Sequence, residues 1–196
     1  MKTVIFFSSP CGGKDTHADL LITFLKKQSI PYLYVSTGNY FRNIKKPNQT
    51  LSILEKIMEK GELAPDFLAE GVIVSSLMLQ DLTSEKFLIF NGFPRNLKQA
   101  KILLKILSFY GRIKPEVVFI EVSPEIAIRR MKMRIKGGEK RSDDNIESIH
   151  RRFKIFYEEN ASLIGFLSSP KFQLYRIEGN GEIPEVSKNI FKALLL

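Results

Sequence analysis

The feature that most constrains the fold is the stretch 5–16, which reads IFFSSPCGGKDT. A short apolar run leads into a turn of small residues, which is followed by Lys14 and by a helical pattern. Backbone N–H groups in such a turn converge on an anion, and the positive end of the following helix points to the same place. A lysine at this position reaches terminal phosphates as a point charge. The stretch therefore predicts a strand, a phosphate-binding loop (P-loop) and a helix in succession.

The match to the pattern G-x-x-x-x-G-K-[ST] is incomplete. Ser8 stands where the pattern has Gly, and Asp15 stands where it has Ser or Thr. A Gly-rich turn between a strand and a helix, without a bound phosphate, is the alternative interpretation. The choice between the two depends on the rest of the chain.

Composition limits the class of protein. A chain of 196 residues with 44% hydrophobic content suits one α/β domain with a sizeable core. The formal net charge of +9 suits polyanions, whether nucleotides, nucleic acid or membrane surfaces. No block of Lys and Arg is long enough to resemble a nucleic-acid-binding tail, so we expect neither nucleic acid nor membrane as a partner.

The single cysteine, Cys11, excludes an internal disulfide and a zinc site built from several cysteines. It also fits a reducing compartment. The apolar run at residues 4–7 is too short for a signal peptide, and no apolar stretch approaches membrane-spanning length. We therefore expect a soluble, cytoplasmic, monomeric protein.

Short apolar runs alternate with segments of helical periodicity along the whole chain. This alternation predicts a doubly wound parallel sheet with helices on both faces, and a ligand at the carboxyl ends of the strands. The predicted strands are residues 2–7, 32–35, 87–90, 117–120 and 172–177.

Basic residues follow the predicted strands at three places, with Lys14, Arg42 and Arg95. Strand-end loops share one crevice in this architecture, so these side chains are expected to face one another. For any one arginine the alternative is a solvated surface charge. Asp143 and Asp144 either cap the long helix predicted over 142–167 or pair with arginines. A second basic group contains Arg130, Arg134, Arg141 and Arg152.

Phosphoryl transfer fits this inventory of side chains. It needs little covalent help from the protein; catalysis comes from alignment of donor and acceptor and from positive charge around the transferring group. Neither His17 nor His150 is an obvious base, because both are expected on helices.

With these residues assembled, the chain resembles the nucleoside monophosphate kinases, and the adenylate kinases most closely. The resemblance covers nearly the whole length. Its markers are Ser36-Thr37-Gly38 with Arg42, the stretch 61–66 (GELAPD), Gly92-Phe93-Pro94-Arg95 with Gln99-Ala100, the stretch 141–144 (RSDD) with Arg152, and Gly179. The family loop reads Gly-Lys-x-Thr, which puts Thr16 in place and Asp15 at the variable position.

The resemblance implies the P-loop kinase fold, with a five-stranded parallel sheet wrapped by helices, and MgATP as the donor. It divides the chain into a core (1–38, 67–129 and 142–196), a monophosphate-binding segment (39–66) and a short lid (130–141) without the cysteines of the zinc-binding type. Implied catalytic residues are Lys14, Arg95, Arg130, Arg134, Arg141 and Arg152. Implied ATP-binding residues are Cys11, Gly12, Gly13, Lys14, Asp15, Thr16, Arg130 and Gly181. Implied AMP-binding residues are Thr37, Arg42, Ala64, Gly92, Arg95, Gln99, Arg141 and Arg152. Implied magnesium contacts, largely through water, are Thr16 and Asn91.

Base choice also follows from the resemblance. Thr37 and Gln99 stand at adenine-contacting positions, where uridylate and cytidylate kinases carry Ala and Asn. Asn96, which follows Arg95, is often seen in those relatives. The favoured function is transfer of the terminal phosphoryl group of ATP to AMP, giving two ADP. Another monophosphate as the acceptor, UMP or CMP among them, is the alternative.

Four departures from the family pattern cluster at the nucleotide and metal site. Ser8, Cys11 and Asp15 stand at frequent Gly positions, and Asn91 replaces an Asp that orients the water shell of magnesium. Asparagine keeps an acceptor oxygen but loses the charge, so Asn91→Asp is predicted from sequence to strengthen magnesium-dependent turnover. A nucleotide-binding relative with little or no activity and a regulatory role is thus a further hypothesis.

Overall fold

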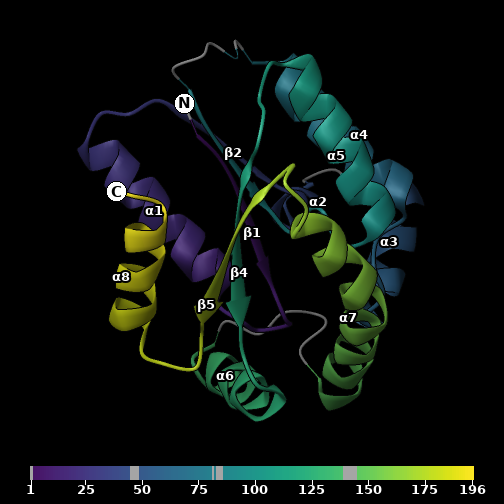
Figure 1. Ribbon diagram of the computed structural model, residues 1–196. Helices are drawn as coiled ribbons and strands as arrows, with labels where there is room; N and C mark the ends of the chain where they lie inside the picture. Colours follow the sequence, from purple (N-terminus) through teal and green to yellow (C-terminus); the bar gives the residue numbers. More distant parts are fainter. Residues whose placement is uncertain (1, 45–48, 81, 83–85, 139–144) are drawn as a thin grey trace.

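Figure 1 shows the computed structural model, which describes residues 2–44, 49–80, 82, 86–138 and 145–196. At its centre lies an all-parallel sheet with the strand order β2-β3-β1-β4-β5. Its strands lie within one or two residues of the predicted ones, so the predicted α/β class is confirmed. They are β1 (Thr3–Ser8), β2 (Tyr32–Ser36), β3 (Phe87–Asn91), β4 (Glu116–Glu121) and β5 (Gln173–Glu178).

Helices cover both faces of the sheet (Figure 1). Each connection between neighbouring parallel strands runs through at least one of them, as a parallel sheet requires. They are α1 (Lys14–Lys27), α2 (Thr37–Arg42), α3 (Gln49–Glu59), α4 (Asp66–Met78), α5 (Leu97–Phe109), α6 (Pro124–Lys136), α7 (Ile146–Leu167) and α8 (Ile183–Ala193).

The core is divided in two by the sheet. Ile5 and Phe7 of β1 point into a cluster with residues of α4, α5 and α7, whereas Val4 and Phe6 point into a cluster with residues of α1, α6 and α8. This division follows from the two-residue period of a strand. Strand β1 is apolar at both sets of positions and is buried on both sides, as a central parallel strand should be.

Side-chain caps set the starts of several helices. The Asn145 side chain accepts a hydrogen bond from the Ser148 backbone N–H at 2.7 Å, so α7 begins at Ile146 and not at the predicted residue 142. The Asn96 side chain caps α5 in the same way, by accepting from the Gln99 N–H at 2.8 Å. The two candidate caps, Asp143 and Asp144, lie outside the described residues.

Candidate active site

The loop between β1 and α1 has the predicted strand-loop-helix form. Gly13 caps α1 with φ 89°, and the cap makes no side-chain hydrogen bond to the start of that helix. Cys11 also has a positive φ, of 55°. Uncapped N–H groups at a helix start are a ready site for an anion. A loop of this form can therefore receive an anion such as a phosphate.

Ser8 fits into this loop although the pattern has Gly there. Its hydroxyl donates to the Ser9 carbonyl at 2.9 Å. A Cβ atom on Gly12 would lie 2.8 Å from the Ser8 Cβ, which is closer than real side chains approach. The turn therefore accommodates a side chain at position 8 because position 12 has none.

Lys14, the first residue of α1, lies in a region of positive charge. The pKa of Lys14 is lowered, chiefly by burial and also by the charges of Arg95 and Arg152, while Asp15 acts in the opposite direction. The Lys14 Nζ lies 3.2 Å from the Asp15 Oδ1. Three cations from α1, the β3–α5 loop and α7 thus influence one another, and an anion between them would relieve their repulsion.

A pocket at the carboxyl ends of β1, β2 and β3 brings most of the predicted acceptor-site residues together. It also has apolar walls from Phe41, Met58 and Phe156, which sequence reasoning did not single out because such residues resemble ordinary core. The predicted residues that line it are Lys14, Asp15, Thr37, Arg42, Ala64, Asn91, Gly92, Arg95, Gln99 and Arg152.

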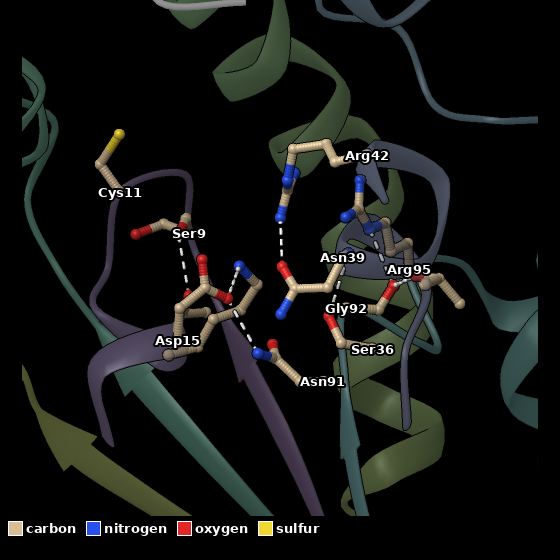
Figure 2. A network of polar contacts seen from close by, with 12 residues as sticks. Ser9, Cys11, Asp15, Ser36, Asn39, Arg42, Asn91, Gly92 and Arg95 are labelled. Atoms are coloured by element: carbon tan, nitrogen blue, oxygen red, sulfur yellow. Dashed lines mark hydrogen bonds and ion pairs between the residues drawn. The ribbon is translucent and has the colours of Figure 1, made fainter. Parts of the chain in front are cut away.

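Two arginines of this pocket are oriented by short local hydrogen bonds. Arg95 donates from Nε to the Gly92 carbonyl at 2.9 Å, and Arg42 donates from Nη2 to the Asn39 Oδ1 at 2.6 Å. In Figure 2 they lie on the opposite side of the crevice from Asp15. A Cβ atom on Gly92 would lie 3.2 Å from the Arg95 Nη2, so a glycine at this position leaves room for the guanidinium.

Gln99 is held at both ends of its amide. Its Oε1 accepts from the Arg95 backbone N–H at 2.7 Å, and its Nε2 donates to the Asp66 Oδ1 at 2.8 Å. Asn96 donates to the same Asp66 oxygen at 3.0 Å. A carboxylate only accepts, so Asp66 fixes which way the Gln99 amide points. Asp66 was visible in the sequence only as part of the marker at 61–66.

Thr37 lines the same pocket as Gln99 and is also oriented. The Thr37 hydroxyl donates to the Gly92 carbonyl at 3.0 Å, and Thr37 as a whole is 3% exposed. The hydroxyl proton is used by this bond, so the oxygen is left as an acceptor toward a ligand.

A second predicted group lies at the phosphate loop but does not line this pocket. Arg130 donates from Nη2 to the carbonyls of Gly179 at 2.7 Å and Gly181 at 3.2 Å. Arg134 lies 3.7 Å from the Cys11 Sγ. Arg134 thus contacts the loop itself, and Arg130 contacts Gly181, another of the residues implied to bind ATP.

The remaining predicted site residues are Gly12, Thr16 and Arg141. Gly12 is buried in the loop, and Thr16 is exposed in the first turn of α1. Arg141 lies outside the described residues, as do residues 139 and 140 of the predicted lid.

A polar residue beside the phosphate loop, Asn91, has an oxygen of the type that a divalent cation takes. Asn91, at the end of β3, is 1% exposed, and its Oδ1 is buried without a hydrogen-bond partner among the described residues. No group of three or more His, Cys, Asp or Glu residues that could hold a metal occurs within the described ranges. Zinc sites are built from such groups, whereas magnesium needs only one or two protein ligands beside phosphates and water.

None of the described helices is both long enough and apolar enough to cross a membrane.

Comparisons with known proteins agree with this geometry. A family model described as adenylate kinase matches residues 6–171. A protein named adenylate kinase from Leptospira biflexa is 34% identical over 99% of this chain and all of its own length. A protein of the same name from Thermus thermophilus is 34% identical over 98% of this chain and 97% of its own length. One from Xanthomonas oryzae is 32% identical over 97% of this chain and 98% of its own length. The chain therefore belongs to the adenylate kinase family.

Proposed function

We propose that the protein transfers the terminal phosphoryl group of ATP to AMP, giving two ADP. One observation carries the proposal: Lys14 of the phosphate loop and the arginines at positions 42, 95 and 152 line a single pocket, which also contains Thr37 and Gln99. Donor phosphates on the loop and an acceptor phosphate among the arginines would thus meet without covalent participation by the protein.

The acceptor side is proposed to bind AMP. Arg42 and Arg95 would grip its phosphate, since a planar guanidinium binds phosphate oxygens in pairs. Phe41, Met58 and Phe156 would contact the apolar faces of the base. Thr37 and Gln99 would contact its polar edge, together with Ala64 and Gly92 of the lining. The fixed amide of Gln99 favours one pattern of donors and acceptors, and so one base.

The donor side is proposed to bind ATP. Its phosphates would lie on residues 11–16, and its adenosine near Arg130 and Gly181. During transfer the charge on the moving group would be stabilised by Lys14 together with Arg95, Arg130, Arg134, Arg141 and Arg152. All of these residues but Arg141 are described, and they come from four separate segments of the chain.

The domain division proposed is a core, a monophosphate-binding segment at 39–66 and a lid at 130–141. Closure of the last two over the substrates would exclude water, which otherwise hydrolyses ATP.

The cofactor is proposed to be Mg²⁺ bound with ATP. The Asn91 Oδ1, which is buried and has no partner among the described residues, and the Thr16 hydroxyl are oxygen donors of the type that magnesium takes, mainly through its water shell. When bound, this ion neutralises phosphate charge.

The experiment that tests the proposal is a set of initial rates of nucleoside diphosphate formation from ATP with AMP, dAMP, GMP, CMP and UMP. We expect the highest kcat/KM with AMP. A preference for UMP or CMP would assign the alternative acceptor. Measurable ATP binding without turnover of any acceptor would instead make the chain a nucleotide-binding relative and overturn the proposal.

A further inference from the structure

A carboxylate beside Lys14 of the phosphate loop lies on α1 and not on the sheet. Asp15, in the first turn of α1, accepts a hydrogen bond through Oδ1 from the Asn91 Nδ2 at 2.8 Å. The same Oδ1 lies 3.2 Å from the Lys14 Nζ. Figure 2 shows the Asp15 and Asn91 side chains meeting beside the loop.

The orientation of the Asn91 amide follows from its partners. An ionised carboxylate only accepts, so the NH₂ group of Asn91 has to face Asp15. The same nitrogen donates to the Tyr34 hydroxyl at 2.8 Å. Both amide protons are thereby used, and the amide oxygen is left for another partner.

The amide oxygen of Asn91 is itself buried in the protein. Asn91 is 1% exposed, and its Oδ1 has no hydrogen-bond partner in the described part of the chain. Buried polar oxygens in folded proteins are nearly always satisfied by protein, water or a ligand. The Oδ1 thus marks a place beside the Asp15 carboxylate where a donor or a cation belongs.

We propose that Asp15 supplies the negative charge toward the divalent cation that accompanies ATP, and that Asn91 is the residue that positions it. This inference rests on the proposed function, because the cation arrives with the donor nucleotide. The family pattern has a carboxylate at the end of β3, where this chain has the amide of Asn91. Here the carboxylate lies in the first turn of α1 instead, at Asp15. Magnesium commonly takes one or two carboxylates beside phosphates and water, so one relocated carboxylate suffices.

The same geometry changes the outcome expected for Asn91→Asp alone. The replacement sets a second carboxylate in the place of an amide that lies 2.8 Å from the Asp15 Oδ1. Two adjacent carboxylates repel each other, and one of them tends to take up a proton. The sequence alone predicts that Asn91→Asp strengthens magnesium-dependent turnover. The structure predicts no such increase unless Asp15 is neutralised at the same time.

The test measures Mn²⁺ binding by electron paramagnetic resonance, with Mn²⁺ as a probe for Mg²⁺ and a non-hydrolysable ATP analogue as the nucleotide. The variants are Asp15→Asn, Asn91→Asp and the double variant that carries both changes. Asp19→Asn is the matched control, because Asp19 is exposed one turn further along α1. Circular dichroism confirms that each variant is folded.

We expect Asp15→Asn to weaken Mn²⁺ binding to the protein–nucleotide complex by roughly 10- to 100-fold, the usual effect of removing a group that tunes a metal site. The double variant should recover most of that loss, and Asp19→Asn should bind as the unmodified protein does. Unchanged Mn²⁺ affinity in Asp15→Asn, or a double variant as weak as Asp15→Asn, would overturn the inference. If Asp15→Asn binds Mn²⁺ normally while the unmodified protein converts AMP to ADP, the inference fails but the proposed function stands. Failure of the unmodified protein to bind the analogue at all would remove both.

Discussion

Arg95 is the side chain with the strongest single claim to the acceptor phosphate. It lines the pocket and is oriented by its bond to the Gly92 carbonyl. Truncating one partner of a buried, hydrogen-bonded charge pair costs about 2–5 kcal/mol. We therefore expect Arg95→Ala to weaken AMP binding at least about 30-fold, measured by isothermal titration calorimetry, with ATP binding little changed. Arg129→Ala, at an exposed site on α6, is the control. Intact AMP affinity in Arg95→Ala would contradict the assigned role.

His17 gives a pH dependence to stability. Burial, and secondarily the charge of Arg130, lower the pKa of His17 from 6.5 to about 4, while its Nδ1 lies 2.9 Å from the Ser187 Oγ. Between these values the unfolded chain binds a proton at this position and the folded chain does not. Stability is therefore lost as pH falls through 6.5 toward 4, by up to about 3 kcal/mol.

Urea unfolding in the presence of EDTA, at pH values from 7 to 4, measures this contribution. In His17→Asn, which keeps a polar group near the Nδ1 position, the free energy of unfolding should fall less over this range than in the unmodified protein. Parallel curves for the two proteins would contradict the lowered pKa of His17 in the folded state.

At the scale of residues, the sequence indicated which side chains belong to the pocket but not how they are held. The sequence pattern was sufficient to predict the pocket residues that follow strands or stand in recognisable markers, namely Lys14, Arg42, Arg95 and Gln99. The contact of Asp66 with Gln99 joins two segments 33 residues apart, and that of Asp15 with Asn91 joins segments 76 residues apart. Such contacts depend on how elements pack, which no local pattern contains.

The end of α3 meets the start of α7 at Gly61. Gly61 has φ 75°, and a Cβ atom there would lie 2.7 Å from the Ser148 carbonyl oxygen. The Ser148 hydroxyl donates to the Glu59 carbonyl at 2.7 Å, and Arg151 pairs with Glu62 at 3.0 Å. These contacts fix the position of the proposed monophosphate-binding segment against α7.

Gly61→Ala should therefore lower the free energy of unfolding by about 2 kcal/mol or more. The left-handed conformation alone costs a residue with a Cβ roughly 1–2 kcal/mol, and the contact with Ser148 adds to it. Gly71→Ala is a matched control, because Gly71 is an exposed residue inside α4 with nothing within 4 Å of the added atom. This control should gain about 0.5–1 kcal/mol from helix propensity. Equal effects of the two changes in thermal unfolding would contradict the packing at Gly61.

At the scale of elements, periodicity predicted each strand and most helices, because apolar runs of a parallel sheet are distinctive. The start of α7 was placed four residues too early, since the sequence offers several candidate caps and only the fold shows that Asn145 is the one used. Exposure of Phe67 on α4, at 69%, was likewise not predictable, because an apolar residue at helical spacing resembles core.

For the whole molecule, the net charge of +9 is explained in part by basic residues gathered around one crevice. A bisubstrate analogue, two adenosines joined by a chain of phosphates, would contact both basic groups at once. At 100 times its dissociation constant it should stabilise the fold by about 2.7 kcal/mol, or roughly 5–10 °C in thermal midpoint.

Arg130→Ala should lose a large part of this shift, because Arg130 belongs to the donor-side group at the phosphate loop. Arg129→Ala, its exposed neighbour, should keep the shift. Thermal unfolding with and without the analogue gives both values. Equal shifts in the two variants would mean that Arg130 does not contact the donor.

The central claim is that the protein transfers a phosphoryl group from ATP to AMP in this crevice. The most direct measurement follows isotopically heavy AMP by mass spectrometry after incubation with light ATP and the purified protein. Transfer produces heavy ADP and light ADP in equal amounts. The result that would contradict the claim is light ADP and free phosphate with the heavy AMP unchanged, or no reaction at all.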